Sequence, residues 1–199
     1  MSAEVLSHLT PAASQKPHRQ CAGPPVWEGH IPFAFWCVER WRPRVLVELG
    51  THSGNSYFAF CQSVATHQTG TRCFAVDTWQ GDPHAGAYGN EIFNDVSNYN
   101  RQHYESFSCL LRMQFDEALG QFADGSVDLL HIDGFHTYEA ARHDFETWLP
   151  KMSSRGVVLF HDSNVFSHNF GVWRLMRELE SRFPHFHFLH SNGLSMFTL

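Results

Sequence analysis

The sequence predicts an α/β fold in which a mostly parallel sheet is covered by helices on both faces. Short apolar runs alternate with stretches of helical period, as in Val45–Leu49 followed by Asn55–His67. Buried strands that alternate with helices in this way are typical of parallel sheets. The chain closes on two further apolar runs joined through Asn192-Gly193, a hairpin signal. We therefore expect one antiparallel strand at the end of the sheet.

The remaining elements follow in a regular order. An aromatic stretch from Phe33 to Trp41 predicts a helix before Pro43. The segment Trp79–Tyr104 has no clear period, so a functional loop or an inserted helix is expected there. Further strands are predicted at Arg72–Asp77, Cys109–Met113, Val127–Ile132, Gly156–Phe160, His185–His190 and Leu194–Phe197. Further helices are predicted at Asp116–Phe122, Tyr138–Leu149, which Pro150 stops, and Val172–Phe183.

Length and composition indicate one domain and exclude some partners. The chain has 199 residues, of which 1–25 are expected to form a flexible N-terminal arm and 26–199 a single domain. With a net charge of -6 and no basic stripe, nucleic acid is not an expected partner. The five Cys show no C-x-x-C pattern, and no signal peptide or apolar run of membrane length is visible. We expect a cytoplasmic protein without membrane contact.

The first candidate site is the segment Glu48-Leu49-Gly50-Thr51-His52-Ser53-Gly54, between a strand and a helix. Its glycines permit a tight turn and the close approach of a ligand, and Glu48 suits a ligand ammonium group. Asp77, at the end of the next strand, can accept both hydroxyls of a ribose. The alternative is a plain glycine turn with a solvated Glu48. The candidate cofactor contacts are Glu48, Gly50, Thr51, Ser53, Gly54, Asp77 and Asp133.

The second candidate site combines the ends of two later strands. Asp133 ends one strand, His136 lies a few residues on, and the pair His161-Asp162 ends the next strand. Two carboxylates that converge at a sheet edge repel each other unless a cation or a proton lies between them. Oxygen ligands of this type suit Mg, Ca or Mn. The alternative is that one carboxylate caps the following helix while the other is solvated.

Four motifs in order, VELGTHSGNS, FAVDTW, HIDGFHTY and LFHDS, resemble class I S-adenosyl-L-methionine-dependent methyltransferases. More narrowly, they resemble the group that contains sugar O-methyltransferases of macrolide and polysaccharide pathways. The resemblance covers Val45 to the C-terminus. It implies a Rossmann-like, seven-stranded sheet whose last strand is antiparallel. It also implies that Glu48, Gly50 and Gly54 hold the methionine part of the cofactor and that Asp77 holds the ribose.

The resemblance extends to the reaction. In metal-dependent relatives, Asp residues matching Asp133 and Asp162 bind Mg, and a His matching His136 is the general base. This chain has Ser163 where those relatives carry Asp or Asn, which leaves Asn164 as a substitute.

The predicted activity is therefore methylation of a hydroxyl on a sugar or glycosylated natural product, with Mg as a candidate second cofactor. His136 would take the proton while Asp133 orients it or binds the cation. His161 is a second candidate base. Methyl transfer requires alignment of the acceptor oxygen and removal of its proton.

The segment Gln80–Tyr104 is expected to contact the acceptor, with His84 and Tyr88 as the candidate substrate contacts. Aromatic and polar side chains together suit a saccharide or other small-molecule acceptor, with a phenol or a polyketide left open. A homodimer or a larger biosynthetic assembly is also expected. The rival classes are a nicotinamide-dependent oxidoreductase, which the E-x-G-x-x-x-G spacing disfavours, and a non-catalytic methyltransferase-like domain.

Overall fold

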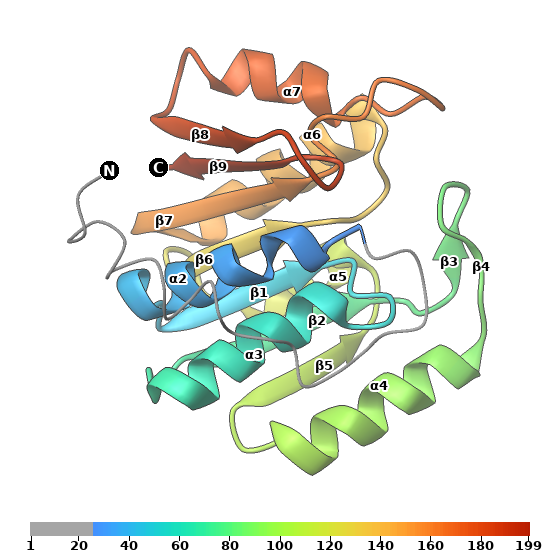
Figure 1. The fold of residues 1–199 in the computed structure, drawn as a ribbon, viewed down its shortest axis with the longest axis vertical. Coiled ribbons are helices and arrows are strands. Elements are labelled where there is room, and N and C mark those ends of the chain that lie inside the picture. The colour runs from blue at the N-terminus through green and yellow to red at the C-terminus, as the bar shows by residue number, and fades with distance from the viewer. Residues whose placement is uncertain (1–25) are drawn as a thin grey trace.

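A computed structural model describes residues 26–199, so the arm predicted for residues 1–25 lies outside the described residues. Seven strands form one sheet in the order β5-β2-β1-β6-β7-β9-β8 (Figure 1). Neighbouring strands are parallel from β5 to β7, whereas β9 is antiparallel to β7 and to β8. The predicted fold class is confirmed. The strands are β1 Val45–Leu49, β2 Arg72–Asp77, β5 Ser108–Arg112, β6 Val127–Ile132, β7 Met152–His161, β8 His185–Phe188 and β9 Leu194–Thr198.

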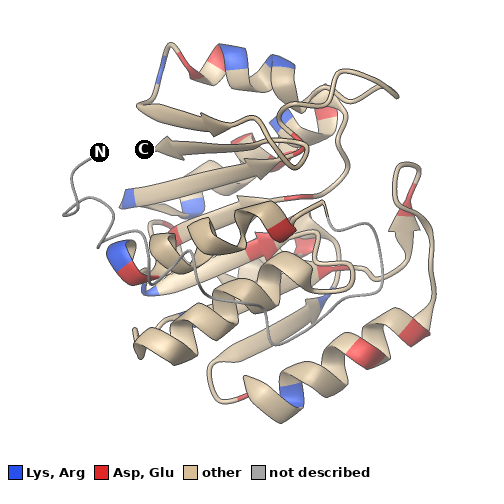
Figure 2. Ribbon diagram, in the orientation of Figure 1, with Lys and Arg blue, Asp and Glu red and all other residues tan. Residues whose placement is uncertain are grey.

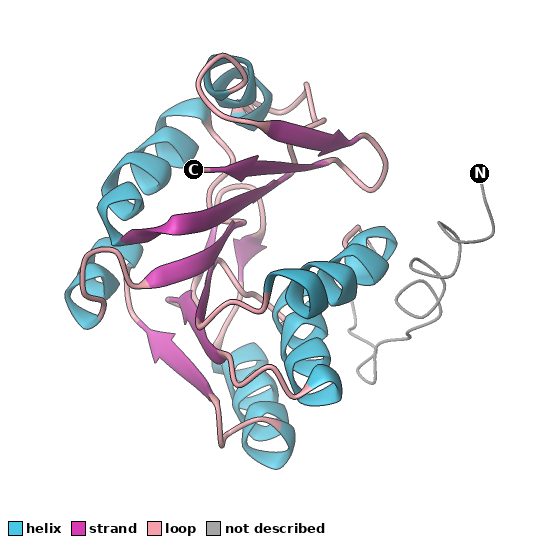
Figure 3. Ribbon diagram, turned by 90° about the vertical axis from the view of Figure 1, so that its left-hand side faces the viewer, coloured by secondary structure: helices cyan, strands magenta, loops and turns pink. Residues whose placement is uncertain are grey.

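Helices cover both faces of the sheet (Figure 3). One apolar cluster joins the sheet to α2 Ile31–Trp41, α3 Asn55–His67 and α4 Asn90–His103. A second cluster joins the opposite face to α5 Phe115–Ala118, α6 Tyr138–Trp148 and α7 Val172–Leu179. Short 3-10 helices occupy Glu28–His30, Leu119–Gln121 and Leu149–Lys151. No helix between residues 26 and 199 is long and apolar enough to cross a membrane.

Local sequence signals account for most boundaries. The hydroxyl of Thr137 accepts a hydrogen bond from the backbone N–H of Ala140 and caps the start of α6, which ends before Pro150. Every residue of β6 is buried, the polar Asp128 and His131 included, as expected for a central parallel strand. The bounds of β1, β2, β6 and α3 match the predicted ones. In contrast, β7 starts at Met152 rather than at Gly156, because Met152 still pairs with Val127 of β6 before an irregularity in the ladder, after which Val157 pairs with Leu129.

The segment predicted as a loop or an inserted helix contains both. A short hairpin, β3 Gly81–Asp82 with β4 Gly86–Ala87, is followed by the helix α4. The buried residues of α4 are Val96 and the polar Asn100, so its apolar signal is weak. The side chain of Asn100 accepts from the Ser108 hydroxyl, which anchors α4 to β5.

The carboxyl ends of the central strands meet at one edge of the sheet. Beyond β1, the backbone N–H of Gly50 donates to the Val76 carbonyl, and the N–H of Asp133 donates to the Leu49 carbonyl, at 2.9 and 2.8 Å. The ladder therefore continues for one residue past the strands. Ligands of open α/β sheets bind at this edge, and the chemistry-bearing side chains gather here.

Candidate active site

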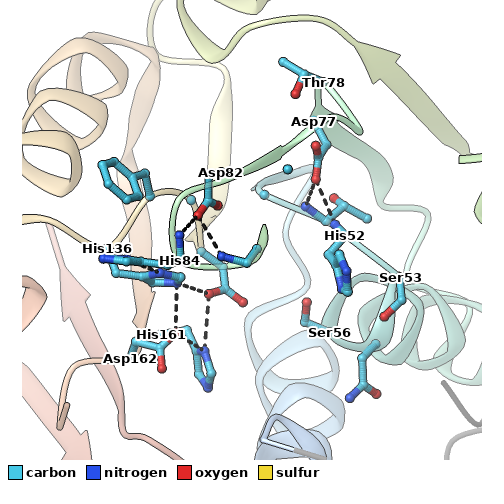
Figure 4. A pocket seen from close by; sticks show the side chains of 18 of the residues that line it. His52, Ser53, Ser56, Asp77, Thr78, Asp82, His84, His136, His161 and Asp162 are labelled. Atoms are coloured by element: carbon cyan, nitrogen blue, oxygen red, sulfur yellow. Dashed lines mark hydrogen bonds and ion pairs between the residues drawn. The ribbon is translucent and has the colours of Figure 1, made fainter. Parts of the chain in front are cut away.

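A pocket of about 550 Å³ lies at the carboxyl ends of β1, β2, β6 and β7. Figure 4 shows two groups of side chains on opposite sides of it. We call residues 50–53 together with Asp77 the loop wall. We call Asp133, His136, His161 and Asp162 the charged wall. All members of both walls line the pocket.

The loop wall depends on glycine conformation. Gly50 has a φ of +86°, and a Cβ there would lie 2.1 Å from the carbonyl oxygen of Asp133, so only glycine fits. Gly54, with a φ of +81°, precedes the first turn of α3 but does not line the pocket. Thr51 and Ser53 do line it. Within the described chain, the buried Oγ1 of Thr51 has no hydrogen-bond partner, which leaves it available to a ligand.

Asp77 fixes this loop from the end of β2. Its Oδ2 accepts from the backbone N–H groups of Thr51 and His52, both at 2.8 Å, and its Oδ1 accepts from the N–H of Trp79 at 2.6 Å. Oδ2 thus accepts two hydrogen bonds and Oδ1 only one, so Oδ1 has a second lone pair free. The side chain therefore shapes the loop and retains acceptor capacity toward the pocket.

Glu48 does not reach the pocket. It is fully buried, and its Oε2 lies 2.8 Å from Nδ1 of His131, its partner across the β1–β6 ladder. Burial raises the pKa of Glu48, and His131 offsets this only in part. The His131 ring packs against Trp27 and Phe60 beneath α3. Glu48 is therefore held by His131 outside the pocket lining, and its predicted contact with the methionine part of the cofactor stays a prediction.

The charged wall forms because β6 and β7 are neighbours. Nε2 of His136 lies 2.9 Å from Asp162 Oδ2 and 3.5 Å from Asp133 Oδ1. Nδ1 of His161 lies 3.1 and 3.3 Å from the same two oxygens. Each imidazole thus bridges both carboxylates, as expected for acids that converge at a sheet edge.

Burial and charge oppose each other in this cluster. Burial alone would lower the pKa of each imidazole, but the two carboxylates outweigh it and raise the pKa of His136 to about 9 and that of His161 to about 10. Burial would likewise raise the pKa of both carboxyls. The imidazoles outweigh it, so the pKa of Asp133 lies far below its usual range and that of Asp162 falls to about 2. Two anions therefore face two cations.

His161 has acceptors at both ring nitrogens. Its Nδ1 faces the two carboxylates, and its Nε2 donates to the carbonyl of Ser191 at 3.2 Å. A carbonyl oxygen can only accept, so Nε2 carries a proton. The geometry thus holds His161 as an imidazolium without a free lone pair, which argues against its expected role as a second base.

The predicted acceptor contacts lie on different sides of the pocket. Nδ1 of His84, at the β3–β4 turn, lies 3.4 Å from Nδ1 of His136, and the His84 ring stacks on Phe170 with centroids 4.4 Å apart. Tyr88 instead packs edge-on against His52 of the loop wall, at 4.7 Å. Both His84 and Tyr88 line the pocket.

Sequence reasoning predicted the turn between β8 and β9 but missed its contact with the charged wall. Asn164, the expected substitute ligand, donates its amide to the Leu189 carbonyl and does not join the charged wall. The amide of Asn192 does join it, donating to Asp162 Oδ1 at 2.8 Å. The buried His30 also donates to the Ser191 carbonyl. The only local signal for this turn was the pair Asn192-Gly193, which indicated a hairpin and nothing more.

The pocket is lined by carboxylates and imidazoles but by no lysine or arginine among the described residues. Figure 2 shows Lys and Arg mostly on helices and at the amino ends of strands, away from this edge. Arg112, at the end of β5, is bonded to the Thr78 carbonyl and to Asn90. An anionic group of a ligand would find imidazoles and backbone N–H groups here but no guanidinium or ammonium partner.

A family model described as "Methyltransferase domain" matches residues 47–163, more than half of the chain. The chain belongs to the methyltransferase domain family. A curated relative, the Sinorhizobium fredii protein y4gI, described as uncharacterized, is 55% identical over 171 residues. The match covers 86% of this chain but 19% of the relative, so the chain spans about a fifth of the curated relative it matches.

Solved methyltransferases share the fold. The O-methyltransferase TomG of Streptomyces achromogenes, in complex with S-adenosylmethionine (SAM), is 12% identical with a TM-score of 0.61, covering 100% of this chain and 91% of that one. A Bacillus cereus O-methyltransferase in complex with S-adenosylhomocysteine (SAH) is 14% identical, with a TM-score of 0.63 and the same coverage. The SAH-bound PaMTH1 of Podospora anserina is 12% identical, with a TM-score of 0.63, covering 99% and 88%. At these identities the likeness is one of fold.

Proposed function

We propose that this methyltransferase domain transfers the methyl group of SAM to a hydroxyl of a sugar or glycosylated natural product, with His136 as the general base. The observation that carries the proposal is the His136–Asp162 pair, 2.9 Å apart, across the pocket from the glycine loop. In the reaction the sulfonium–methyl bond breaks, the oxygen–methyl bond forms, and the hydroxyl proton passes to the imidazole. The family match favours this activity over the nicotinamide alternative.

The loop wall suits the cofactor. The pocket of about 550 Å³ has the size of small-ligand sites. The absent side chain of Gly50 lets a ligand approach the backbone, while Thr51 Oγ1 and Asp77 offer polar partners. We propose that Asp77 accepts from the ribose. Glu48 lies outside the pocket lining, paired with His131.

The charged wall suits proton transfer. Asp162 and Asp133 accept from Nε2–H of His136, which makes Nδ1 the atom that takes the proton. A carboxylate that orients an imidazole through its other nitrogen is a recurring arrangement for general bases. The contact of Nδ1 with His84 is long, at 3.4 Å, so an acceptor hydroxyl can replace it. Because the pKa of His136 is about 9, we expect kcat of the metal-free protein to rise with pH up to about 9.

The charges favour a neutral acceptor. The absence of Lys and Arg from the lining, within residues 26–199, argues against phosphorylated or coenzyme-A-linked acceptors. The rings of His84 and His136 line the pocket and both stack on Phe170, and sugars pack their C–H faces on aromatic rings. These features support a saccharide over a charged small molecule.

The test begins with SAM binding by isothermal titration and continues with a screen of free glycosides, their phosphates and phenols, measured as SAH release. We expect SAM to bind and a neutral glycoside to be methylated. In His136→Ala, kcat should fall about 10²–10⁴-fold, with the SAM dissociation constant within about twofold.

His143→Ala is the matched control. Its imidazole lies on α6, is exposed, and pairs with Asp116 outside the pocket, so turnover should be unchanged. Near-wild-type turnover by His136→Ala would remove His136 from the proposal. Failure to bind SAM would instead favour a non-catalytic domain.

A divalent cation is the second candidate, because ligand atoms of Asp133, His136 and Asp162 lie within 4.8 Å of one another. Two carboxylates are oxygen donors that suit Mg. A bound cation would acidify the acceptor hydroxyl. It would also displace the proton from Nε2 of His136, so Nδ1 would no longer be oriented by Asp162. Loss of activity on chelation and recovery on adding Mg²⁺ would favour the cation, and indifference to the chelator would favour the base alone.

A further inference from the structure

The turn between β8 and β9 reaches the charged wall from the far edge of the sheet. Three consecutive residues, Ser191, Asn192 and Gly193, have φ values of +51°, +65° and +88°. Asp162, which the turn contacts, also has a positive φ, of +54°. Such conformations are unfavourable for most residues other than glycine, asparagine and aspartate, so Ser191 in particular is held there by its surroundings. The two segments with positive φ lie against each other.

Hydrogen bonds join the turn to the segment after β7. The backbone N–H of Asn164 donates to the Asn192 carbonyl at 2.8 Å, and the Asn164 amide donates to the Leu189 carbonyl at 2.8 Å. The Ser191 carbonyl accepts from both His161 and His30. The position of Asn192 relative to Asp162 is therefore fixed by the backbone.

From this geometry we infer that Asn192 is a positioning residue that orients Asp162 and, through it, His136. Its amide occupies Oδ1 of Asp162 at 2.8 Å, which leaves Oδ2 directed at Nε2 of His136 at 2.9 Å. Asn192 itself is exposed, but the Asp162 side chain is only 8% exposed, so its carboxylate has few water partners to replace the amide. The inference rests on the proposed function, because the role of His136 belongs to it.

A purely conformational role for Asn192 is the alternative, since asparagine tolerates the left-handed region. Asn192→Gly separates the two roles, because glycine favours that backbone at least as well but lacks the amide. We expect kcat about tenfold lower, as for loss of a hydrogen bond to a charged group, with an unchanged SAM dissociation constant. The melting temperature should fall as well, because Oδ1 of the buried Asp162 loses its partner. Asn192→Asp, which keeps the shape but sets a carboxylate against Asp162, should lose at least as much activity.

Gln68→Gly is the matched control. Gln68 is exposed at the end of α3 with a φ of +47°, far in sequence from the charged wall, and has no place in the pocket lining. Gln68→Gly introduces glycine at a residue with a similar positive φ, and we expect no change in kcat. If kcat of Asn192→Gly or Asn192→Asp stays within twofold of wild type, Asn192 has only a conformational role.

Crystal structures of the wild type and of Asn192→Gly test the inference without an acceptor. We expect the separation of Asp162 Oδ2 and His136 Nε2 to exceed about 3.5 Å in the variant, beyond hydrogen-bonding distance. A separation that stays at the wild-type value would overturn the inference. The proposed function fails on a different result, namely that the wild-type chain binds no SAM or methylates no acceptor.

Discussion

The two walls of the pocket face each other but are built from different parts of the chain. The loop wall is a backbone structure, in which glycine conformation and N–H groups bound to Asp77 set the shape. The charged wall is a side-chain structure, in which carboxylates and imidazoles compensate each other. Substitutions should therefore damage the loop wall through conformation and the charged wall through the loss of individual groups.

The largest effect is expected where the two walls touch. In Gly50→Ala, the added Cβ would lie 2.1 Å from the Asp133 carbonyl oxygen, which belongs to backbone and cannot rotate away. Left-handed strain and overpacking together should cost about 3–5 kcal/mol of unfolding free energy. SAM binding should be lost as well. Chemical denaturation and isothermal titration measure the two effects.

Gly70→Ala isolates the conformational part of this cost. Gly70 has a similar φ of +75°, but a Cβ there meets nothing within 4 Å. Its loss should be about 1–2 kcal/mol, with SAM binding intact. Equal losses in the two variants would show that the contact between the walls contributes nothing.

The same contrast explains how far the sequence alone could lead. The loop wall is nearly contiguous, so the strand, the glycine turn and the helix were predictable from local pattern, and so was the strand-end Asp77. Convergence of Asp133 and Asp162 followed from the expected order of neighbouring strands. Asn192 could not be found in this way, because its contact with Asp162 depends on how a distant hairpin packs.

The orientation of Glu48 also depends on distant parts of the chain. Motif position put it at the ligand, but its register opposite His131 buries it beneath the sheet edge. Alternation of side chains along a strand is a local rule, whereas the choice of face depends on which helices cover the sheet. The sequence therefore predicted which acids lie near the edge and not which way each one points.

Asp144 is a buried carboxylate outside both walls, and it shows how the pKa of a carboxyl changes when no imidazole is paired with it. Asp144 lies on α6 close to Gly134 and is 7% exposed. Unlike Asp133 and Asp162, it has no imidazole hydrogen bond among the described residues. Burial, aided by the charge of Asp116, raises the pKa of Asp144 to about 7. Folding therefore keeps a proton on Asp144 that the unfolded chain releases near pH 4.

Stability contributed by the protonated Asp144 is complete below about pH 4 and is lost as the pH rises to about 7. Asp144→Asn removes this loss and should raise the unfolding free energy on the order of 2–4 kcal/mol at pH 8. At pH 4 the variant and the wild type should agree. Denaturation at both pH values measures the difference.

Asp124→Asn is the control, since Asp124 is 75% exposed in its pair with Lys151 and should show no such dependence on pH. A gain for Asp144→Asn that is equal at both pH values would contradict the assignment.

The smallest effect is expected from Asp77→Asn. This variant tests most directly whether the loop wall and the charged wall act independently. The amide retains one acceptor oxygen but sets an NH₂ group against a backbone N–H, because both carboxylate oxygens now accept. The loop should lose its tight geometry, and SAM affinity should fall about tenfold, the cost of one hydrogen bond to a charged acceptor. At saturating SAM, kcat should stay close to wild type.

Asp82→Asn provides the crossed comparison. Asp82 makes a similar turn, with its Oδ1 accepting from the N–H groups of His84 and Ala85 at 2.6 and 2.9 Å, but it lies on the hairpin that carries His84 toward the charged wall. We expect this variant to raise the KM of the acceptor and leave SAM affinity unchanged. If Asp77→Asn also lowers kcat at saturating SAM, or if Asp82→Asn weakens SAM binding, the walls act as one unit. The side-chain geometry of the charged wall would then depend on the backbone conformation of the loop wall, through the contact between Gly50 and Asp133.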